Sequence, residues 1–195
     1  MTKLEKLIKN RIQETGPISI AAYMSECLLH PELGYYTQKN VLGSRGDFIT
    51  SPEISQMFGE ILGLCLAQYW IDLNRPARFA LVEFGPGNGT LMLDILRAGS
   101  SVKGFIEAVE IFLVEASSKL KSKQQKKLSK FNVNWINDDL VIPQIPTLFI
   151  ANEFFDALPV KQYQRENDLW YEVQVGIKND RLSLGLSHEH TTHPE

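Results

Sequence analysis

The sequence has few cysteines, no excess of basic charge and no long hydrophobic run. Its two cysteines, Cys27 and Cys65, have no CxxC spacing, which argues against a small fold built on disulfides. The 20 basic and 23 acidic residues give a net charge of −3, so no basic excess indicates a nucleic-acid partner. The apolar stretch near Ile61–Trp70 is far shorter than the ~18 residues that a membrane span needs. We therefore expect neither nucleic-acid binding nor membrane insertion.

The first residues do not have the composition of an organelle presequence. The start, MTKLEK, mixes acidic and basic residues, whereas a presequence is rich in arginine and poor in acids. Together with two cysteines that we expect to be reduced and buried, this predicts a cytoplasmic protein of bacterial type. With 195 residues, 44% of them hydrophobic, the chain is long enough to bury a sizeable core.

The hydrophobic periodicity changes along the chain and divides it into four segments. Residues 1–75 read as a helical extension, with helices expected at about 2–14, 19–29 and 53–73 and a long loop at 31–52. In 76–159, strands at 79–84, 109–114, 133–136 and 147–151 alternate with helices at 90–98 and 117–129, which predicts βαβ units and a parallel α/β sheet. Residues 160–186 predict an antiparallel meander with turns at 166–168 and 178–180, and 187–195 a polar tail.

A glycine-rich loop follows the first of these strands, in the stretch LVEFGPGNGT at 81–90. Gly85, Gly87 and Gly89, with Pro86 between the first two, lead directly into a helix, where a backbone without Cβ atoms lets a ligand approach closely. The dinucleotide fingerprint is GxGxxG, whereas this loop is GxGxG, and Glu83 would fit poorly beside a pyrophosphate. A carboxylate there suits a sulfonium or ammonium group, so the pattern indicates S-adenosylmethionine. A nicotinamide cofactor and a turn without a ligand are the alternatives.

Acidic residues after the second and third strands are the next candidates for this cofactor. Glu115 ends the second strand, where a carboxylate in Rossmann-like folds holds ribose hydroxyls; Glu110 and Glu107 are its rivals. Asp138 and Asp139 follow the third strand, and either bond the adenine amino group or cap a turn.

The fourth strand ends in the polar and aromatic stretch ANEFFDALP at 151–159. Ligands in open α/β sheets bind beyond the carboxyl ends of the strands, so Asn152, Glu153 and Asp156 are candidates for a site that holds a methyl acceptor. The alternative is a helix start, with Asn152 as the N-cap and the two acids facing the helix dipole.

Several long motifs occur in an order that identifies a family. They are HPELGYY (30–36), GDFITSPEISQMFGE (46–60), VEFGPGNGT (82–90), LVEAS (113–117) and ANEFFDALPV (151–160). The chain resembles the MidA-like methyltransferases over roughly Ile18 to Gln164. This family includes a mitochondrial complex I assembly factor that acts on an arginine. The resemblance implies a Rossmann-like class I methyltransferase fold, S-adenosylmethionine as donor and a protein arginine as acceptor, with a respiratory complex I subunit as the substrate of the mitochondrial members.

Methyl transfer to a guanidinium requires groups that hold its charge and accept its proton. Paired carboxylates do both, and the candidates are Glu153, Asp156, Asp47 and Glu53. We expect Glu153 and Asp156 to face the acceptor and the loop at 46–53 to close over donor and acceptor. The side chains expected to line the pocket from this loop are Phe48, Thr50, Ser51 and Pro52.

The predicted fold is incomplete at its C-terminus compared with a class I methyltransferase, whose sheet has seven strands. Only four parallel strands can be followed, so we expect an N-terminal portion of a longer enzyme, with a separate C-terminal half as partner and weakened activity in this chain alone. The alternative function is a non-catalytic assembly or docking factor of the same fold.

Two clusters of charged or polar side chains have a structural interpretation that we favour over a functional one. The lysines between 119 and 130 favour a solvated helix face over a nucleic-acid patch, and the histidines at 188, 190 and 193 favour a polar tail over a metal site.

Overall fold

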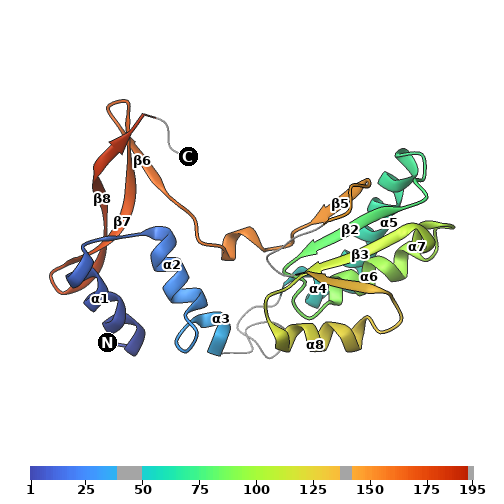
Figure 1. The fold of residues 1–195 in the computed structure, drawn as a ribbon, viewed down its shortest axis with the longest axis horizontal. Helices are drawn as coiled ribbons and strands as arrows, with labels where there is room; N and C mark the ends of the chain where they lie inside the picture. The colour runs from blue at the N-terminus through green and yellow to red at the C-terminus, as the bar shows by residue number, and fades with distance from the viewer. Residues whose placement is uncertain (39–49, 137–141, 193–195) are drawn as a thin grey trace. The chain divides into compact units, whose positions relative to one another are not determined.

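The computed structural model describes residues 1–38, 50–136 and 142–192, which form two compact units (Figure 1). The first unit combines both ends of the chain, Met1–Asn40 and Asp156–Glu195. The second unit is the continuous segment Val41–Phe155. Residues 50–75, which the sequence groups with the N-terminal helices, thus lie in the unit of the parallel sheet.

A four-stranded parallel sheet forms the centre of the second unit. Its strands are β2 (Phe79–Phe84), β3 (Val109–Val114), β4 (Val133–Ile136) and β5 (Thr147–Ile150), in the order β4-β3-β2-β5. The predicted parallel α/β arrangement is confirmed. The run of β2 is apolar because both faces of the sheet are buried there: Phe79 and Leu81 belong to one core cluster, and Ala80 and Val82 to another.

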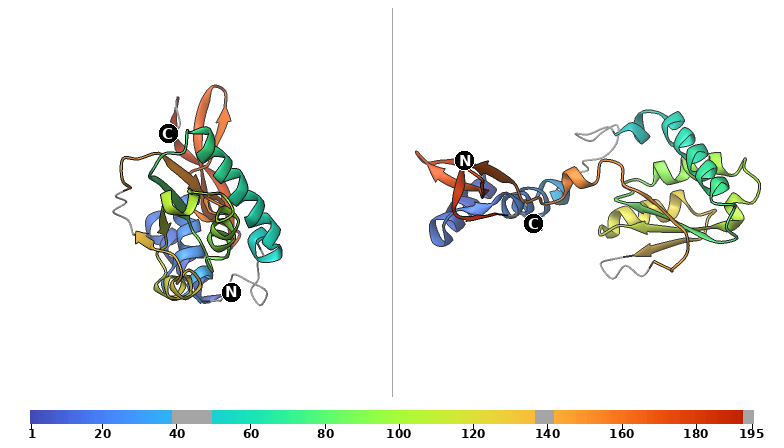
Figure 2. Two further views of the ribbon diagram at one scale, coloured as in Figure 1. Left: turned by 90° about the vertical axis from the view of Figure 1, so that its right-hand side faces the viewer. Right: turned by 90° about the horizontal axis from the view of Figure 1, so that it is seen from above.

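Helices cover the sheet on the face that holds the larger core. They are α4 (Ser51–Ile54), α5 (Gln56–Asp72), α6 (Thr90–Gly99), α7 (Phe105–Ala108) and α8 (Ser118–Lys127). The core joins Trp70 of α5, Ile95 of α6 and Phe105 of α7 to Phe79 and Leu81 of the central strand. Figure 2, in which α5 is the long teal helix, lets this arrangement be followed from two further sides.

The helix predicted at 53–73 is divided in two and presents a different face to the core than expected. Ser55 is extended, with φ −143° and ψ 119°, and it separates α4 from α5. The buried residues of α5 are Gly59, Gly63, Leu66, Ala67 and Trp70. Helical spacing predicts that a different apolar stripe faces the core, namely Ile54, Met57, Phe58, Ile61, Leu62, Cys65 and Tyr69. Of these, Leu62 packs against the core and the other six are exposed. Cβ atoms at Gly59 and Gly63 would meet α6 at 2.6–2.7 Å, so the small residues let the two helices approach closely.

Of the two cysteines predicted to lie in the core, Cys65 does not. It is exposed on α5, because the apolar stripe that contains it does not face the sheet. Cys27 is half-buried and packs against the core of the first unit.

Three helices of the first unit lie within residues 1–38: α1 (Lys3–Thr15), α2 (Ile20–Leu29) and the short α3 (Tyr35–Gln38). Thr2 and Ser19 cap α1 and α2, each accepting a hydrogen bond from a backbone N–H three residues on, at 3.0 and 3.1 Å. The predicted helices at 2–14 and 19–29 are confirmed. The region predicted as a loop contains α3 and α4 at its two ends.

An antiparallel sheet completes the first unit, built from β1 (Ile18–Ser19), β6 (Tyr163–Glu166), β7 (Leu169–Lys178) and β8 (Arg181–Thr191). The predicted meander and both of its turns are confirmed, and the central turn residues have the positive φ angles of two-residue hairpins. The predicted polar tail is wrong for residues 187–191, because β8 continues along β7 and pairs His190 with Tyr171. β1 pairs with β7, which joins the beginning of the chain to its end.

Within the described residues, none of the helices combines the length and apolar character needed to cross a membrane.

Candidate functional site

The four parallel strands of the second unit end at one edge. In the register of the sheet, Phe84 pairs with Val114, Val114 with Ile136, and Glu83 with Ile150. The glycine loop, the segment after β3 and the segment after β5 therefore leave the sheet side by side. Since this is the edge where open α/β sheets bind ligands, it is the candidate site.

The glycine loop turns sharply between β2 and α6. The Gly85 N–H donates to the Val114 carbonyl at 3.1 Å, and the Gly89 N–H donates to the Pro86 carbonyl at 2.7 Å. Gly85 has a φ of +61°, and a Cβ there would lie 2.5 Å from a ring carbon of Phe154. A side chain at Gly85 is therefore excluded twice, by its backbone conformation and by the ring packed against it.

Glu83 lies at the end of β2 and is buried, with 3% of its surface exposed. Its Oε2 atom is buried without a hydrogen-bond partner among the described residues. Burial raises the pKa of this carboxyl to about 8 from an ordinary 4.5. A buried carboxyl with a free oxygen next to a glycine loop fits a cationic group of a ligand, and it fits a pyrophosphate poorly. The residues present thus fit S-adenosylmethionine, as the glycine spacing predicted.

Glu115 is the acid at the carboxyl edge of β3. It is buried, and Oε1 accepts from the Ser117 N–H at 2.8 Å. Its rival Glu110 begins β3 at the opposite edge and pairs with Arg78 at 2.6 Å, while Glu107 lies exposed on α7. Of the three candidate acids, Glu115 is the one that lies at the edge where the glycine loop begins. The geometry therefore favours Glu115 as the partner of the ribose hydroxyls.

Gln124 is a component of this site that was not predicted from the sequence. It is fully buried in α8, and its amide joins Glu115 to the carbonyl of Gly87. In the sequence it stands among lysines of a helix expected to be solvated. Helical spacing places it one turn before Leu128, which is also buried, and that was the only available signal.

The helix α4 contacts the glycine loop through Glu53. Its Oε1 accepts from the Thr90 hydroxyl at 2.6 Å and from the Asn88 amide at 3.4 Å. Glu53 was a candidate for the acceptor side, and here it holds the loop instead. Thr50 precedes α4, Ser51 and Pro52 form its first turn, and Pro52 is buried.

The segment after β5 does not begin a helix of any length. Only a 3₁₀ turn forms, at Phe155–Ala157, so the alternative interpretation of Asn152 as a helix N-cap is wrong. Asn152 is half-buried in the second unit, and Glu153 is exposed there with a φ of +49°, which is unusual for a residue with a side chain. Asp156 belongs to the first unit, where its charge contributes to the raised pKa of Tyr36, after the larger effect of burial.

Phenylalanine rings gather where β2 and β5 end. Phe84 stacks on Phe149 with 6.1 Å between centroids and lies 5.7 Å from Phe154, which contacts Phe155. Phe149 and Phe155 are more than half exposed. The candidate site thus has an aromatic surface beside the glycine loop.

Four predicted site residues, Asp47, Phe48, Asp138 and Asp139, lie outside the described residues. Among the described ones, no group of three or more histidines, cysteines or acids is placed to hold a metal ion.

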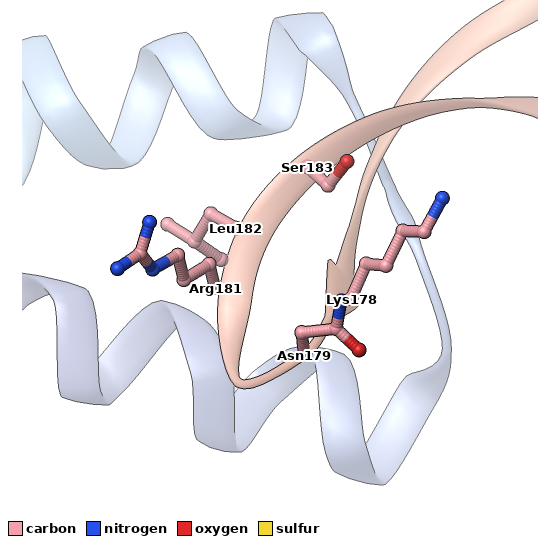
Figure 3. A pocket seen from close by; sticks show the side chains of 5 residues that line it. All are labelled: Lys178, Asn179, Arg181, Leu182 and Ser183. Atoms are coloured by element: carbon pink, nitrogen blue, oxygen red, sulfur yellow. The ribbon is translucent and has the colours of Figure 1, made fainter.

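Two open cavities lie near charged side chains. One of about 520 Å³ adjoins the β7–β8 turn in the first unit, where Figure 3 shows Lys178 and Arg181 pointing away from each other. The other, of about 470 Å³, is lined by Asn88 of the glycine loop together with Lys123, Lys126 and Lys127 of α8. Only the second cavity borders the candidate site.

The chain is similar to named arginine methyltransferases. It is 39% identical over 212 residues to the zebrafish (Danio rerio) "Protein arginine methyltransferase NDUFAF7, mitochondrial" and 37% identical over 214 residues to the human protein of that name. These alignments cover 95% and 96% of this chain, and 50% and 48% of the relatives. The chain spans about half the length of the curated relatives it matches.

A solved structure from Burkholderia thailandensis, described as a "likely methyl transferase" bound to S-adenosyl-homocysteine, has the same fold. It superposes with a TM-score of 0.75 at 26% identity, covering 94% of this chain and 49% of that one. Residues 61–195 also match the sequence family described as "Putative S-adenosyl-L-methionine-dependent methyltransferase". The fold and the cofactor class predicted from the motifs are confirmed, and the chain belongs to this methyltransferase family.

Proposed function

We propose that the chain binds S-adenosylmethionine at the carboxyl edge of the parallel sheet and takes part in methylating an arginine of a protein substrate. Glu83 carries the first part of this proposal, because its buried, unpartnered oxygen beside the glycine loop suits a cationic ligand. The names of the curated relatives support an arginine as the acceptor. A subunit of respiratory complex I is the substrate that the motif resemblance suggests.

The chain's own residues would contribute positioning and proton removal. S-adenosylmethionine, when bound, supplies a methyl group on a positively charged sulfur. The two acids that follow β5, Glu153 and Asp156, are the candidates for holding the guanidinium by hydrogen bonds and for accepting the proton that it loses when its nitrogen forms the new bond to carbon. The phenylalanines around Phe154 would exclude water from the reacting atoms.

Isothermal titration with S-adenosylhomocysteine tests the binding step on the chain as it is. Gly87→Val should weaken binding by at least about 10-fold, because the loop then lacks the backbone freedom that its φ of +52° requires. Gly185→Ala is the matched control, since a Cβ there meets nothing within 4 Å. Unchanged binding by the Gly87 variant would show that the loop is not the donor site.

Transfer of a labelled methyl group to arginine-containing protein tests the second step. Glu153→Gln and Asp156→Asn should each lower the rate by about 10²-fold or more if these acids accept the proton, with S-adenosylhomocysteine binding retained. Full activity in both variants would place the proton acceptor elsewhere.

A second candidate function is a docking factor that binds its protein partner without turnover. The exposed apolar face of α4 and α5 favours it: Ile54, Met57 and Ile61 are 71%, 64% and 55% exposed. Binding of a complex I subunit without incorporation of label would support docking. Incorporation of label into arginine would support the enzyme.

A further inference from the structure

Gln124 of α8 contacts three separate parts of the candidate site. Its amide nitrogen donates to the Gly87 carbonyl at 2.8 Å and to Glu115 Oε2 at 3.1 Å. Its amide oxygen accepts from the indole N–H of Trp135 in β4 at 2.9 Å. One fully buried side chain thus links the glycine loop, the acid after β3 and the neighbouring strand.

The three partners determine which way the amide of Gln124 faces. An indole N–H only donates, so the amide oxygen has to face Trp135. The Gly87 carbonyl and the Glu115 carboxylate accept, so the two N–H groups have to face them. With the amide reversed, its oxygen would face two acceptors and its N–H groups would face the indole N–H. All three partners would then lose their hydrogen bond, and buried polar groups without a partner destabilise the folded chain.

Packing reinforces these hydrogen bonds. A Cβ at Gly89 would lie 3.3 Å from Cγ of Gln124, so the stem of the glutamine lies directly against the loop. Within the part of the chain that the structure describes, each oxygen of Glu115 accepts one hydrogen bond and keeps a further lone pair. The acid is therefore held in place and still able to accept from ligand hydroxyls.

We propose that Gln124 is a positioning residue for the cofactor, which holds the glycine loop and Glu115 in the geometry that receives the ribose of S-adenosylmethionine. This inference rests on the proposed donor site. It gives the lysine-rich helix α8 a role in that site through Gln124, which is buried.

The test compares Gln124→Met with Gln68→Met. Gln68 is an exposed helical glutamine whose amide donates to Asp72 one turn further on, so its variant controls for the change of side chain. We expect Gln124→Met to weaken S-adenosylhomocysteine binding about 10-fold and Gln68→Met to leave it unchanged. Equal affinity of the wild-type and Gln124→Met chains would overturn the proposal.

An analogue that lacks the ribose 2′-hydroxyl separates positioning from general damage to the fold. If Gln124 acts through Glu115 on the ribose, Gln124→Met should lose less affinity for this analogue than for S-adenosylhomocysteine. Equal losses for both ligands would contradict positioning. Trp135→Phe, which keeps a six-membered aromatic ring and removes the indole donor, should weaken binding in the same direction and by less.

Hydrogen exchange without ligand distinguishes failure of this inference from failure of the proposed function. Amides of residues 85, 87–90 and 115–117 should exchange faster in Gln124→Met than in the wild-type or Gln68→Met chains. A wild-type chain that binds neither ligand would overturn the proposed donor site, and with it the cofactor role. Binding by the wild type with unchanged exchange in Gln124→Met would overturn the positioning role alone.

Discussion

Glu83 shows how one buried group connects the sheet to the chemistry of the site. It continues the apolar strand β2 and lies among residues that exclude water, so its charged form is disfavoured and its pKa is about 8. A buried carboxyl without a partner destabilises the folded chain when it ionises. Such a residue fits a role in ligand binding better than a role in stability.

We predict that the stability of the chain falls as pH rises because of Glu83. The unfolded chain releases this proton near pH 4.5 and the folded chain near pH 8, so between these values the folded state holds more protons. The free energy of unfolding should then decrease with rising pH by at most about 1.4 kcal/mol per pH unit from this group. Urea unfolding from pH 5 to pH 8 should show a flatter profile for Glu83→Gln, but not for the exposed control Glu107→Gln. The same slope in all three proteins would contradict the assignment.

The same residue makes ligand binding depend on pH in the opposite direction. A cationic group on the ligand favours ionised Glu83, and below pH 8 the free protein has to release a proton first. Affinity for S-adenosylhomocysteine should therefore rise up to about 10-fold per pH unit from pH 6 to 8 and level off above. Calorimetry across this range measures it, and an affinity that does not change with pH would exclude Glu83 from contact with the ligand's ammonium group.

At the scale of elements, the packing of α5 on α6 depends on glycines. A Cβ at Gly63 would lie 2.7 Å from the carbonyl oxygen of Ile95 and 2.8 Å from its Cα. These are backbone atoms of another helix, so the contact is relieved only if α5 and α6 move apart. Arg97 adds a polar bridge between the helices, with Glu60 at 3.1 Å and the buried Asp94 at 2.6 Å.

We predict that Gly63→Ala destabilises the chain although alanine favours helix. The propensity gain of about 1 kcal/mol is opposed by overpacking, which costs about 1–3 kcal/mol or more against backbone. Thermal unfolding should show a lower midpoint for Gly63→Ala and an unchanged one for Gly185→Ala, whose Cβ meets nothing within 4 Å. A higher midpoint for the Gly63 variant would mean that the helices can separate at little cost.

Among the elements, those with a local signal were predicted well. The bounds of β2, β3 and β4 agree with the predicted strands, since each is a short apolar run bounded by polar or turn residues. The starts of α1 and α2 lie within one residue of the predicted ones, because helical spacing and the capping hydrogen bonds of Thr2 and Ser19 involve residues only three or four positions apart. The four-residue α7 was missed, since one turn of helix has too few residues for a periodic pattern.

On the scale of the whole molecule, the two units have separate cores. The first unit buries Ile8 and Ile12 of α1 against Ile18 and Val175, whereas the larger core belongs to the parallel sheet. Lys9, next to Ile8, is buried as well and reaches the Asp180 carbonyl at 2.6 Å from the other end of the chain. The first unit is therefore held together by residues more than 150 positions apart.

We predict that Ile8→Ala loosens the first unit selectively. Loss of this side chain, which is 1% exposed, should cost about 2–5 kcal/mol, whereas Leu184→Ala, at 67% exposure, should cost little. Hydrogen exchange should speed up in β7 of the Ile8 variant and remain slow in β2. Equal acceleration in both strands would show that the two cores unfold as one.

The sequence by itself determined the parts of this protein that depend on neighbouring residues: the strand and helix starts, the hairpin turns, and the glycine loop with Glu83 before it. Their signals are local, since a cap, a turn or a backbone that needs glycine involves residues a few positions apart. The tertiary structure alone decided which face of α5 is buried, that both ends of the chain share a sheet, and that Gln124 reaches the site. Each of these outcomes depends on residues that are distant in sequence and come into contact only when the chain folds. No pattern of neighbouring residues could therefore predict them.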